Sequence, residues 1–176
     1  SLGRAQKQHT LFIGCADSRV VPDMITRTMP GELFTVRNIA NIVTPYRNTK
    51  EYAVLSVGVE NIVVCGHSYC GGCAAMNQSD EELAHLPNVR RWLQISREVR
   101  ERVDRQMDVE HPQKREWLTE QINILVQMRN LLTYPYISER YNQGQLKIYG
   151  WYYIIETGEI FNFNDQTEEF ELVTAP

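Results

Sequence analysis

The segment Asn61-Ile62-Val63-Val64-Cys65 is an unbroken apolar run, and Gly66 closes it. Two shorter runs of the same kind precede it, at residues 11–14 and 33–36. Continuous apolar runs of this length are typical of strands that are buried on both faces of a parallel sheet. Helical patterns separate the runs, so the order is strand, helix, strand, helix, strand. This order predicts a parallel β-sheet.

Prolines and glycines mark the limits of the helical patterns. Pro22 stands at the start of a short helix expected over residues 23–28, and Pro30-Gly31 ends it. A second helix is expected over residues 52–59, directly before the run that begins at Asn61. Because both connections are short, they fit between neighbouring strands of one sheet.

The second half of the chain changes character. Residues 79–105 form a charged, amphipathic helical connection, and a further helix is expected over 114–132, between Pro112 and Pro135. Residues 146–155 and 159–163 then read as two strands around the turn at Thr157-Gly158. We therefore predict one α/β domain over residues 1–176, with a mostly parallel central sheet flanked by helices and a C-terminal antiparallel β-hairpin.

Composition and charge exclude some classes of binding partner for this domain. The chain has 176 residues and a net charge of −4, with its basic residues dispersed, so we expect no nucleic-acid partner. No apolar run approaches the ~20 residues of a membrane helix, and residues 1–9 have no signal-peptide pattern, so we expect no membrane partner. Four cysteines are too few for a disulfide scaffold of this length and suit a reducing compartment.

Two polar clusters each follow directly on a predicted strand. The first is Cys15-Ala16-Asp17-Ser18-Arg19, and the second is Gly66-His67-Ser68-Tyr69-Cys70-Gly71-Gly72. Carboxyl ends of parallel strands meet at one edge of a sheet, so we expect these clusters to share a site. Two thiolates and one imidazole are ligands that zinc prefers. Cys15, His67 and Cys70 are therefore the predicted ligands of one Zn²⁺ per chain, with the fourth position left for water.

The other cysteines and histidines have simpler interpretations. Cys65 lies inside a strand and is expected in the core, as buried cysteines often are. Cys70-Gly71-Gly72-Cys73 has the spacing of a redox motif, but the neighbouring histidine favours a metal loop, so Cys73 is taken as structural. The remaining histidines, expected to face solvent, are His9, His85 and His111.

Asp17 and Arg19 are two positions apart on the loop that starts at the first ligand. This spacing favours a charge-assisted pair that keeps Asp17 ionised and oriented toward water on the metal. Asp17 is also able to bind the metal itself and close the site. The simplest alternative is a surface ion pair, worth ~0–1 kcal/mol.

The three motifs together resemble the β-class carbonic anhydrases, and residues 123–136 resemble cyanobacterial and related bacterial members. The motifs are the two clusters above and, between them, Gly31-Glu32-Leu33-Phe34 with Arg37-Asn38-Ile39-Ala40-Asn41. The resemblance implies a lyase that hydrates carbon dioxide reversibly to bicarbonate and a proton by zinc-bound hydroxide. It also implies that Cys15, His67 and Cys70 are the zinc ligands and that Asp17 and Arg19 are the catalytic dyad.

The resemblance carries further expectations. Gly71 and Gly72 let the backbone approach the metal site closely, consistent with the steric freedom of glycine. The family assembles as homodimers or multiples of dimers. Members serve carbon utilisation, so we expect a cytoplasmic enzyme, with a carboxysome or an organelle as the other compartments considered.

The chain departs from the family pattern in three ways. It lacks the N-terminal helices that embrace a partner subunit, and the spacing from Asn41 to Tyr52 is shorter than expected, so a loop near Arg47 is missing or deleted. Some bacterial members have a tryptophan where this chain has Phe12, as part of a noncatalytic bicarbonate site. Arg37 and Tyr153 match the other two residues of that site.

Two other functions compete with hydration of carbon dioxide. Relatives of the family with the same metal ligands hydrolyse carbonyl sulfide or carbon disulfide. The second alternative is a zinc-stabilised scaffold without activity, in which Asp17 is the fourth ligand, because structural zinc sites are closed and four-coordinate.

Overall fold

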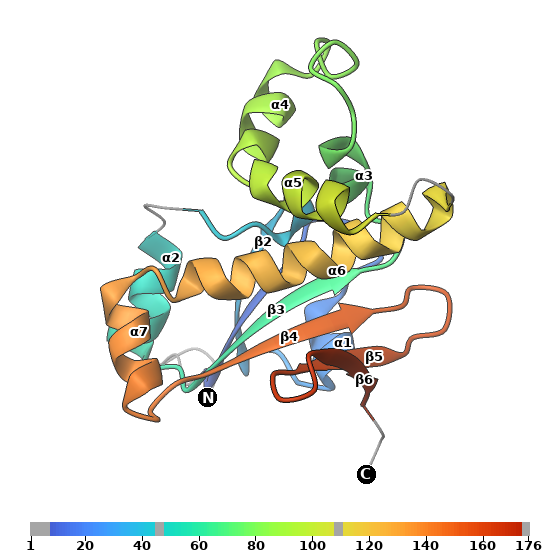
Figure 1. The fold of residues 1–176 in the computed structure, drawn as a ribbon. Helices are drawn as coiled ribbons and strands as arrows, with labels where there is room; N and C mark the ends of the chain where they lie inside the picture. Colours follow the sequence, from blue (N-terminus) through green and yellow to red (C-terminus); the bar gives the residue numbers. More distant parts are fainter. Residues whose placement is uncertain (1–7, 45–47, 108–110, 174–176) are drawn as a thin grey trace.

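A single six-stranded sheet organises the protein, as the computed structural model shows for residues 8–44, 48–107 and 111–173 (Figure 1). The strand order is β2-β1-β3-β4-β5-β6. The first four strands of that order are parallel, and β4–β5 and β5–β6 are antiparallel. The strands are β1 (Thr10–Cys15), β2 (Leu33–Asn38), β3 (Asn61–His67), β4 (Lys147–Tyr153), β5 (Ile160–Asn164) and β6 (Glu169–Leu172). The predicted parallel sheet with a C-terminal hairpin is confirmed.

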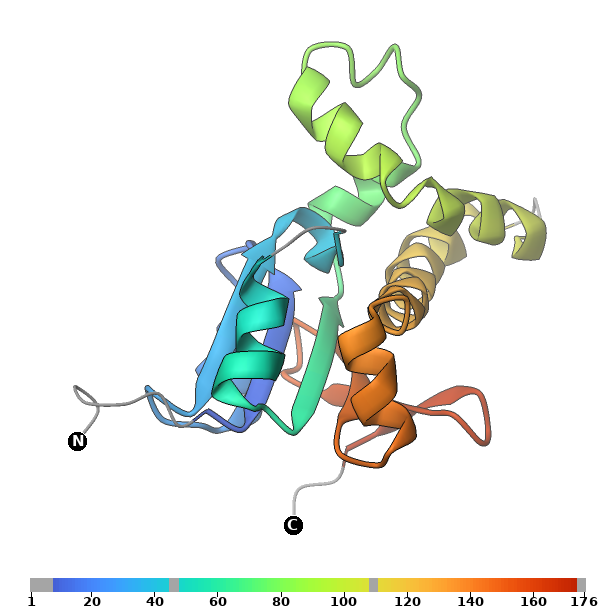
Figure 2. The ribbon, with the colours of Figure 1, turned by 90° about the vertical axis from the view of Figure 1, so that its left-hand side faces the viewer.

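Helices fill the connections and cover the sheet. In Figure 2, α6 is seen nearly end-on, and α6 and α7 lie on the same side of β3. Three helices, α3, α4 and α5, gather beyond the carboxyl end of β3 (Figure 1). The α-helices are α1 (Pro22–Thr26), α2 (Asn48–Glu51), α3 (Gly71–Met76), α4 (Pro87–Gln94), α5 (Arg97–Gln106), α6 (Pro112–Leu131) and α7 (Pro135–Asn142), with a 3-10 turn η1 (Ile39–Asn41) and a π-helix η2 (Tyr52–Val57).

The central strands β1 and β3 are buried on both faces, as their apolar runs predicted. Alternate side chains of β1 join different clusters, because successive residues of a strand point to opposite faces. Leu11 and Ile13 pack in the cluster that contains Ile124 of α6, whereas Phe12 packs in the cluster that contains Ile25 of α1. This burial fixes the positions at which the two strands end.

The helical connection predicted over residues 79–105 is helical from Pro87 onward, and the prediction is wrong for residues 79–86. It consists of turns up to Leu86 followed by α4 and α5, which break at Ile95-Ser96. Pro87 begins α4, where its missing N–H costs no helical hydrogen bond. At the break, the buried hydroxyl of Ser96 accepts a hydrogen bond from Gln127 Nε2 at 2.9 Å. The break therefore lets α5 run back along α6.

The prediction that Gly66 closes its strand is also wrong, because β3 continues through Gly66 to His67. A Cβ at Gly66 would lie 2.7 Å from Cδ1 and 2.7 Å from Cγ1 of Ile124. The glycine thus makes room for α6 to cross the strand. It carries the strand one residue further and places His67 at its end.

The other predicted elements are close to those observed. The helix expected over 114–132 is α6, the helix expected over 23–28 is α1, and the region over 52–59 is the π-helix η2, which ends at Gly58 with φ +77°. The α7 helix and β6 were not predicted. Pro135 suggested a helix end, but it stands in the first turn of α7. The loop expected near Arg47 falls on residues 45–47, outside the described residues.

Candidate metal centre

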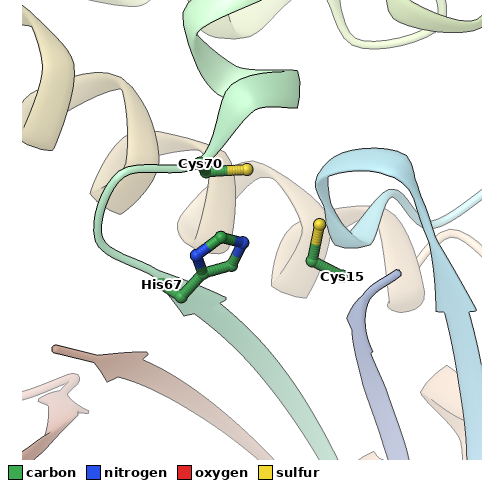
Figure 3. A group of neighbouring side chains, drawn as sticks. All are labelled: Cys15, His67 and Cys70. Atoms are coloured by element: carbon green, nitrogen blue, oxygen red, sulfur yellow. The ribbon is translucent and has the colours of Figure 1, made fainter. Parts of the chain in front are cut away.

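The three predicted ligands come together at the carboxyl ends of neighbouring strands. Cys15 is the last residue of β1 and His67 the last of β3, and these strands are paired in parallel. Cys70 follows three residues later, at the N-cap of α3. Their ligand atoms all lie within 4.8 Å of one another, and all three residues are buried. Figure 3 shows the two sulfur atoms and the imidazole directed at a common space.

His67 has one ring nitrogen engaged and one left over. Nδ1 lies 2.8 Å from the carbonyl oxygen of Ser68, so Nδ1 carries the proton and donates it. Nε2 is buried and has no hydrogen-bond partner among the described residues. A buried polar atom without a partner is costly. The Nε2 lone pair is therefore available to a metal ion.

The thiols of the site also fit a cation. A hydrogen bond with the Cys70 thiol, together with burial, raises the pKa of the Cys15 thiol to about 12. Without a cation, a thiol in this position keeps its proton at neutral pH. Because metal ligation requires the thiolate, a divalent ion would displace protons here. Two sulfurs and one imidazole are a donor set that suits zinc.

Asp17 and Arg19 form the predicted pair. Arg19 Nε donates to Asp17 Oδ1 at 3.0 Å, and Nη2 donates to Oδ2 at 2.6 Å. The backbone N–H of Arg19 adds a third bond to Oδ1 at 2.9 Å. These bonds, the side-chain bonds from Arg19 first among them, hold the pKa of the Asp17 carboxyl well below its usual range. Asp17 is therefore an oriented carboxylate two residues from Cys15.

The connection from His67 to Cys70 is held from several sides. Ser68 N–H donates to the carbonyl of Tyr153 at 2.9 Å, and Ser68 Oγ accepts a bond from the N–H of Ile155 at 2.9 Å. Arg19 Nη2 donates to the carbonyl of Tyr69 at 2.9 Å. Tyr69 has φ +53°, which a residue with a side chain rarely adopts. The first cluster thus fixes the backbone of the second.

The two residues that match the noncatalytic bicarbonate site of some family members lie on different strands. Arg37 is on β2 and Tyr153 is on β4, with β1 and β3 between them. The guanidinium of Arg37 donates to the carbonyls of Cys15 at 3.1 Å, Asp17 at 2.7 Å and Val20 at 2.8 Å. Arg37 therefore shapes the loop that carries the dyad. Tyr153 lies opposite His67 in the register of β3 and β4.

The glycines after Cys70 differ in their surroundings. A Cβ at Gly72 would lie 2.8 Å from Ile39 Cγ2 and 2.9 Å from the Cβ of Ala40. A Cβ at Gly71 would meet no described atom within 4 Å. Gly72 is therefore required for the close approach of α3 to η1, and Gly71 has free space around it.

The residues set aside in the sequence lie outside this group. Cys65 is fully buried in β3, and Cys73 is buried in α3 as a free thiol, so the Cys70–Cys73 spacing forms no disulfide here. Side chains exposed to solvent, as expected, are those of His9, His85 and His111.

One polar residue of the site was missed by sequence reasoning. Glu120 of α6 is 3% exposed, and its carboxylate contacts the backbone of Cys70. It shares a buried face of α6 with Asn123 and Gln127, which hold Ala40 and Val43 by hydrogen bonds of 2.8 Å each. Polar residues at the i, i+3 and i+7 positions of one helix face are a signal for such a role. Because apolar residues surround it in the sequence, Glu120 was not singled out by sequence reasoning.

Comparison of the sequence with known proteins identifies a family and relatives that this chain resembles. The sequence model of the family described as carbonic anhydrase matches residues 10–160. A carbonic anhydrase of Helicobacter pylori strain J99 is 44% identical over 188 aligned positions, which cover 97% of this chain and 83% of the relative. A carbonic anhydrase of Synechococcus elongatus is 38% identical over 172 positions, covering 92% of this chain and 62% of the relative.

Solved structures agree with the sequence comparison. The β-carbonic anhydrase CcaA is 34% identical and superposes with a TM-score of 0.91 over 98% of this chain and 87% of its own. A structure described as one of two tetrameric β-carbonic anhydrases of Sordaria macrospora is 31% identical, with a TM-score of 0.76 over 93% of this chain and 84% of its own.

Proposed function

This chain belongs to the β-class carbonic anhydrases, and we propose that it carries out their reaction with one Zn²⁺ held by Cys15, His67 and Cys70. The reaction is the reversible hydration of carbon dioxide to bicarbonate and a proton, and the chain is an enzyme of the lyase class. The single observation that carries the metal centre is the buried group of two thiols and one imidazole nitrogen within 4.8 Å. The unpartnered Nε2 of His67 supports the same assignment.

The proposed metal ion would supply the nucleophile for this reaction. A bound Zn²⁺ lowers the pKa of a coordinated water from ~15.7 to about 7, which makes hydroxide available at neutral pH. Cys15, His67 and Cys70 would hold the ion with three ligands, which would leave room for that water. The water would add its oxygen to the carbon of carbon dioxide and give up one proton to solvent, so that bicarbonate is the product.

Asp17 is proposed to orient the attacking water. Its carboxylate is ionised and fixed by Arg19, and Oδ2, which accepts one hydrogen bond where Oδ1 accepts two, can accept a further one. Arg19 also keeps the carboxylate in place, because its Nη2 bonds both Asp17 Oδ2 and the carbonyl of Tyr69. This pairing supports an open site over the alternative in which Asp17 is the fourth ligand.

Assembly and location remain part of the proposal. We propose a homo-oligomer, as a dimer or a multiple of dimers, because large apolar side chains around α1 are exposed, such as Met24 at 76% and Met29 at 70%. The β-carbonic anhydrase of Sordaria macrospora is tetrameric. Light scattering should give an even multiple of 20.5 kDa, and a monomer would contradict this assembly.

The cytoplasm is the proposed compartment, since the four free cysteines suit a reducing environment. The described helices include none long and apolar enough to cross a membrane. The noncatalytic bicarbonate site of Arg37 and Tyr153 stays a prediction, which bicarbonate inhibition kinetics of the Tyr153→Phe variant would test.

The deciding experiment is stopped-flow hydration of carbon dioxide with metal content measured on the same sample. The zinc-loaded protein should hydrate carbon dioxide rapidly and should lose this activity with its zinc. His67→Ala, which removes the unpartnered nitrogen, should lose both metal and activity, whereas His85→Ala should keep both. Zinc binding with hydrolysis of carbonyl sulfide but no hydration would favour the sulfur-substrate alternative, and zinc binding with neither reaction would favour the scaffold.

A further inference from the structure

The backbone of Cys70 has a hydrogen-bond partner that the metal centre does not account for. Cys70 is the N-cap residue of α3, and its side chain makes no capping hydrogen bond to the helix. Its N–H donates to Oε2 of Glu120 at 2.9 Å, within the protein interior. Glu120 lies 50 residues away in the sequence, on α6. The long helix behind the sheet therefore reaches the third metal ligand.

Glu120 is itself fixed by a second contact. Its other oxygen, Oε1, accepts a hydrogen bond from the hydroxyl of Tyr152 at 2.6 Å. Tyr152 belongs to β4, next to β3 in the sheet, and is 4% exposed. Both oxygens are thus paired, one with the ligand backbone and one with the sheet. The carboxylate cannot rotate without breaking one of these bonds.

A hydrogen bond to Cys70 matters because the preceding residue is strained. Tyr69 has φ +53°, and residues in that region persist only where their surroundings hold them. Arg19 holds the carbonyl of Tyr69 on one side, and Glu120 holds the next N–H on the other. Loss of either bond would let this peptide relax. The position of the Cys70 sulfur depends on that peptide.

An ordinary structural role would need less than a carboxylate. Burying an acidic group is costly, but its two oxygens here accept from two donors, the Cys70 N–H and the Tyr152 hydroxyl, whereas a neutral amide offers one oxygen. The buried positions one and two turns further along the same face of α6 hold neutral amides, Asn123 and Gln127, which bind backbone groups of their own. Glu120 is the acidic residue of this face, and it is the one that meets a metal ligand.

We propose that Glu120, oriented by Tyr152, is a positioning residue that holds the backbone of Cys70 so that its thiolate is preorganised for the metal ion. This inference rests on the proposed zinc centre and goes beyond it, because Glu120 contacts the backbone of a proposed ligand and is not a member of the ligand group. Partners of this kind, which contact a ligand and not the metal, typically change metal affinity by about 10- to 100-fold when they are removed.

The test measures metal binding and not turnover. Zinc affinity is determined by competition with a chromogenic chelator, and the absorption spectrum of the Co²⁺-loaded protein reports the geometry of the ligands. Glu120→Ala should bind zinc about 10- to 100-fold more weakly. Its Co²⁺ bands should shift, because the Cys70 N–H loses its acceptor. Glu120→Gln keeps an oxygen for that N–H and should recover most of the affinity.

Two further variants make the result specific. Tyr152→Phe keeps the ring but removes the hydroxyl, so it should weaken zinc binding by about 10-fold, the lower end of such effects, and move the Co²⁺ bands in the same direction as Glu120→Ala. Glu116→Gln removes a charge from an exposed position one turn earlier on α6 and should bind zinc as the unchanged protein does.

The outcomes separate this inference from the proposed function. Zinc affinity within about twofold of the unchanged protein and identical Co²⁺ bands, in both Glu120→Ala and Tyr152→Phe, would overturn the role of Glu120 while leaving the metal centre intact. If Glu120→Ala does not fold, the Tyr152→Phe result decides by the same criterion. Failure of the unchanged protein to bind zinc would overturn the metal centre, and this inference with it.

Discussion

Arg19 connects the two halves of the site through one nitrogen atom. Its Nη2 donates to the carboxylate of Asp17 and to the carbonyl of Tyr69, which lies between His67 and Cys70. The planar guanidinium can do this because its donors lie in a fixed fork. A lysine offers a single ammonium and would not reproduce the two-oxygen contact with Asp17. The carboxylate and the ligand loop are thus held in register by a single side chain.

At this scale we predict that Asp17→Asn keeps its metal and loses activity. The amide is not an anion, so it no longer pairs with Arg19 as a charge and orients the attacking water less well. Carbon dioxide hydration should fall by about 100-fold, comparable to removing one preorganised hydrogen-bonding group from an active site. Stopped-flow hydration at matched zinc content measures the effect.

Asp165→Asn, at an exposed turn between β5 and β6, is the matched control and should leave the rate unchanged. Full turnover in Asp17→Asn would remove Asp17 from the mechanism. Loss of zinc in this variant would instead indicate that Asp17 helps to hold the metal.

The sequence reveals some of these residues and hides others for a physical reason. Cys15 and His67 stand directly after buried apolar runs, so their convergence follows from the ends of parallel strands. The Asp17–Arg19 pair is local, because its members are two positions apart. Glu120 contacts Cys70 across 50 positions through the packing of α6 on the sheet, and no local pattern encodes that crossing.

At the scale of elements, periodicity predicts long features better than breaks within them. The strands β1, β2 and β3 and the helix α6 follow from apolar runs and helical spacing. The break between α4 and α5 depends on Ser96, whose hydroxyl is bound by Gln127 from another helix. The short strand β6 depends on pairing with β5, because its sequence alternates charged and apolar residues over only four positions. Tertiary contacts decide such elements.

The crossing of α6 over β3 gives a prediction at this scale. Gly66→Ala places a methyl group 2.7 Å from Ile124, and Cγ1 of that residue cannot move away without shifting its rotamer. The free energy of unfolding should fall by about 1–3 kcal/mol, the usual cost of overpacking a core. Urea denaturation monitored by circular dichroism measures it.

Gly71→Ala offers the contrast, since the added methyl group meets open space in the first turn of α3. Its stability should stay within about 0.5 kcal/mol of the unchanged protein. Equal stability of the two variants would mean that Ile124 repacks without cost.

On the scale of the whole molecule, the proposed metal ion would tie the sheet to the helices beyond it. Cys15 ends β1, His67 ends β3 and Cys70 precedes α3, so one ion would join three elements. Anything that binds the folded state alone raises stability by mass action. Removal of zinc should therefore lower the midpoint of thermal unfolding and loosen all three elements together.

Metal binding should also release protons. The pKa of the Cys15 thiol is raised to about 12, so this thiol is protonated at pH 7 before a cation binds. The ordinary pKa of a cysteine thiol is also above 7, so the second thiol of the group, that of Cys70, is protonated as well. Zinc should therefore displace about two protons when it binds. Its affinity should fall by up to about a hundredfold for each unit that pH is lowered. Calorimetry in two buffers of different ionisation enthalpy counts the protons.

Cys73→Ser serves as the control for this measurement and should release the same number of protons, because its thiol lies outside the ligand group. Binding without proton release would contradict thiolate ligation by Cys15 and Cys70. Binding that strengthens at lower pH would contradict it as well.

The order of these parts along the chain has a consequence for biosynthesis. The three proposed metal ligands are translated by residue 70, but the carboxylate that accepts the Cys70 N–H arrives with residue 120 and the tyrosine bonded to that carboxylate with residue 152. At typical elongation rates this delay is on the order of 10 seconds. During that interval the thiols of a ribosome-bound chain are present without the residues that later fix them. A centre with Cys70 held by Glu120 and Tyr152 would therefore form only after β4 has been translated, and the nascent cysteines would depend on the redox state of the cell until then.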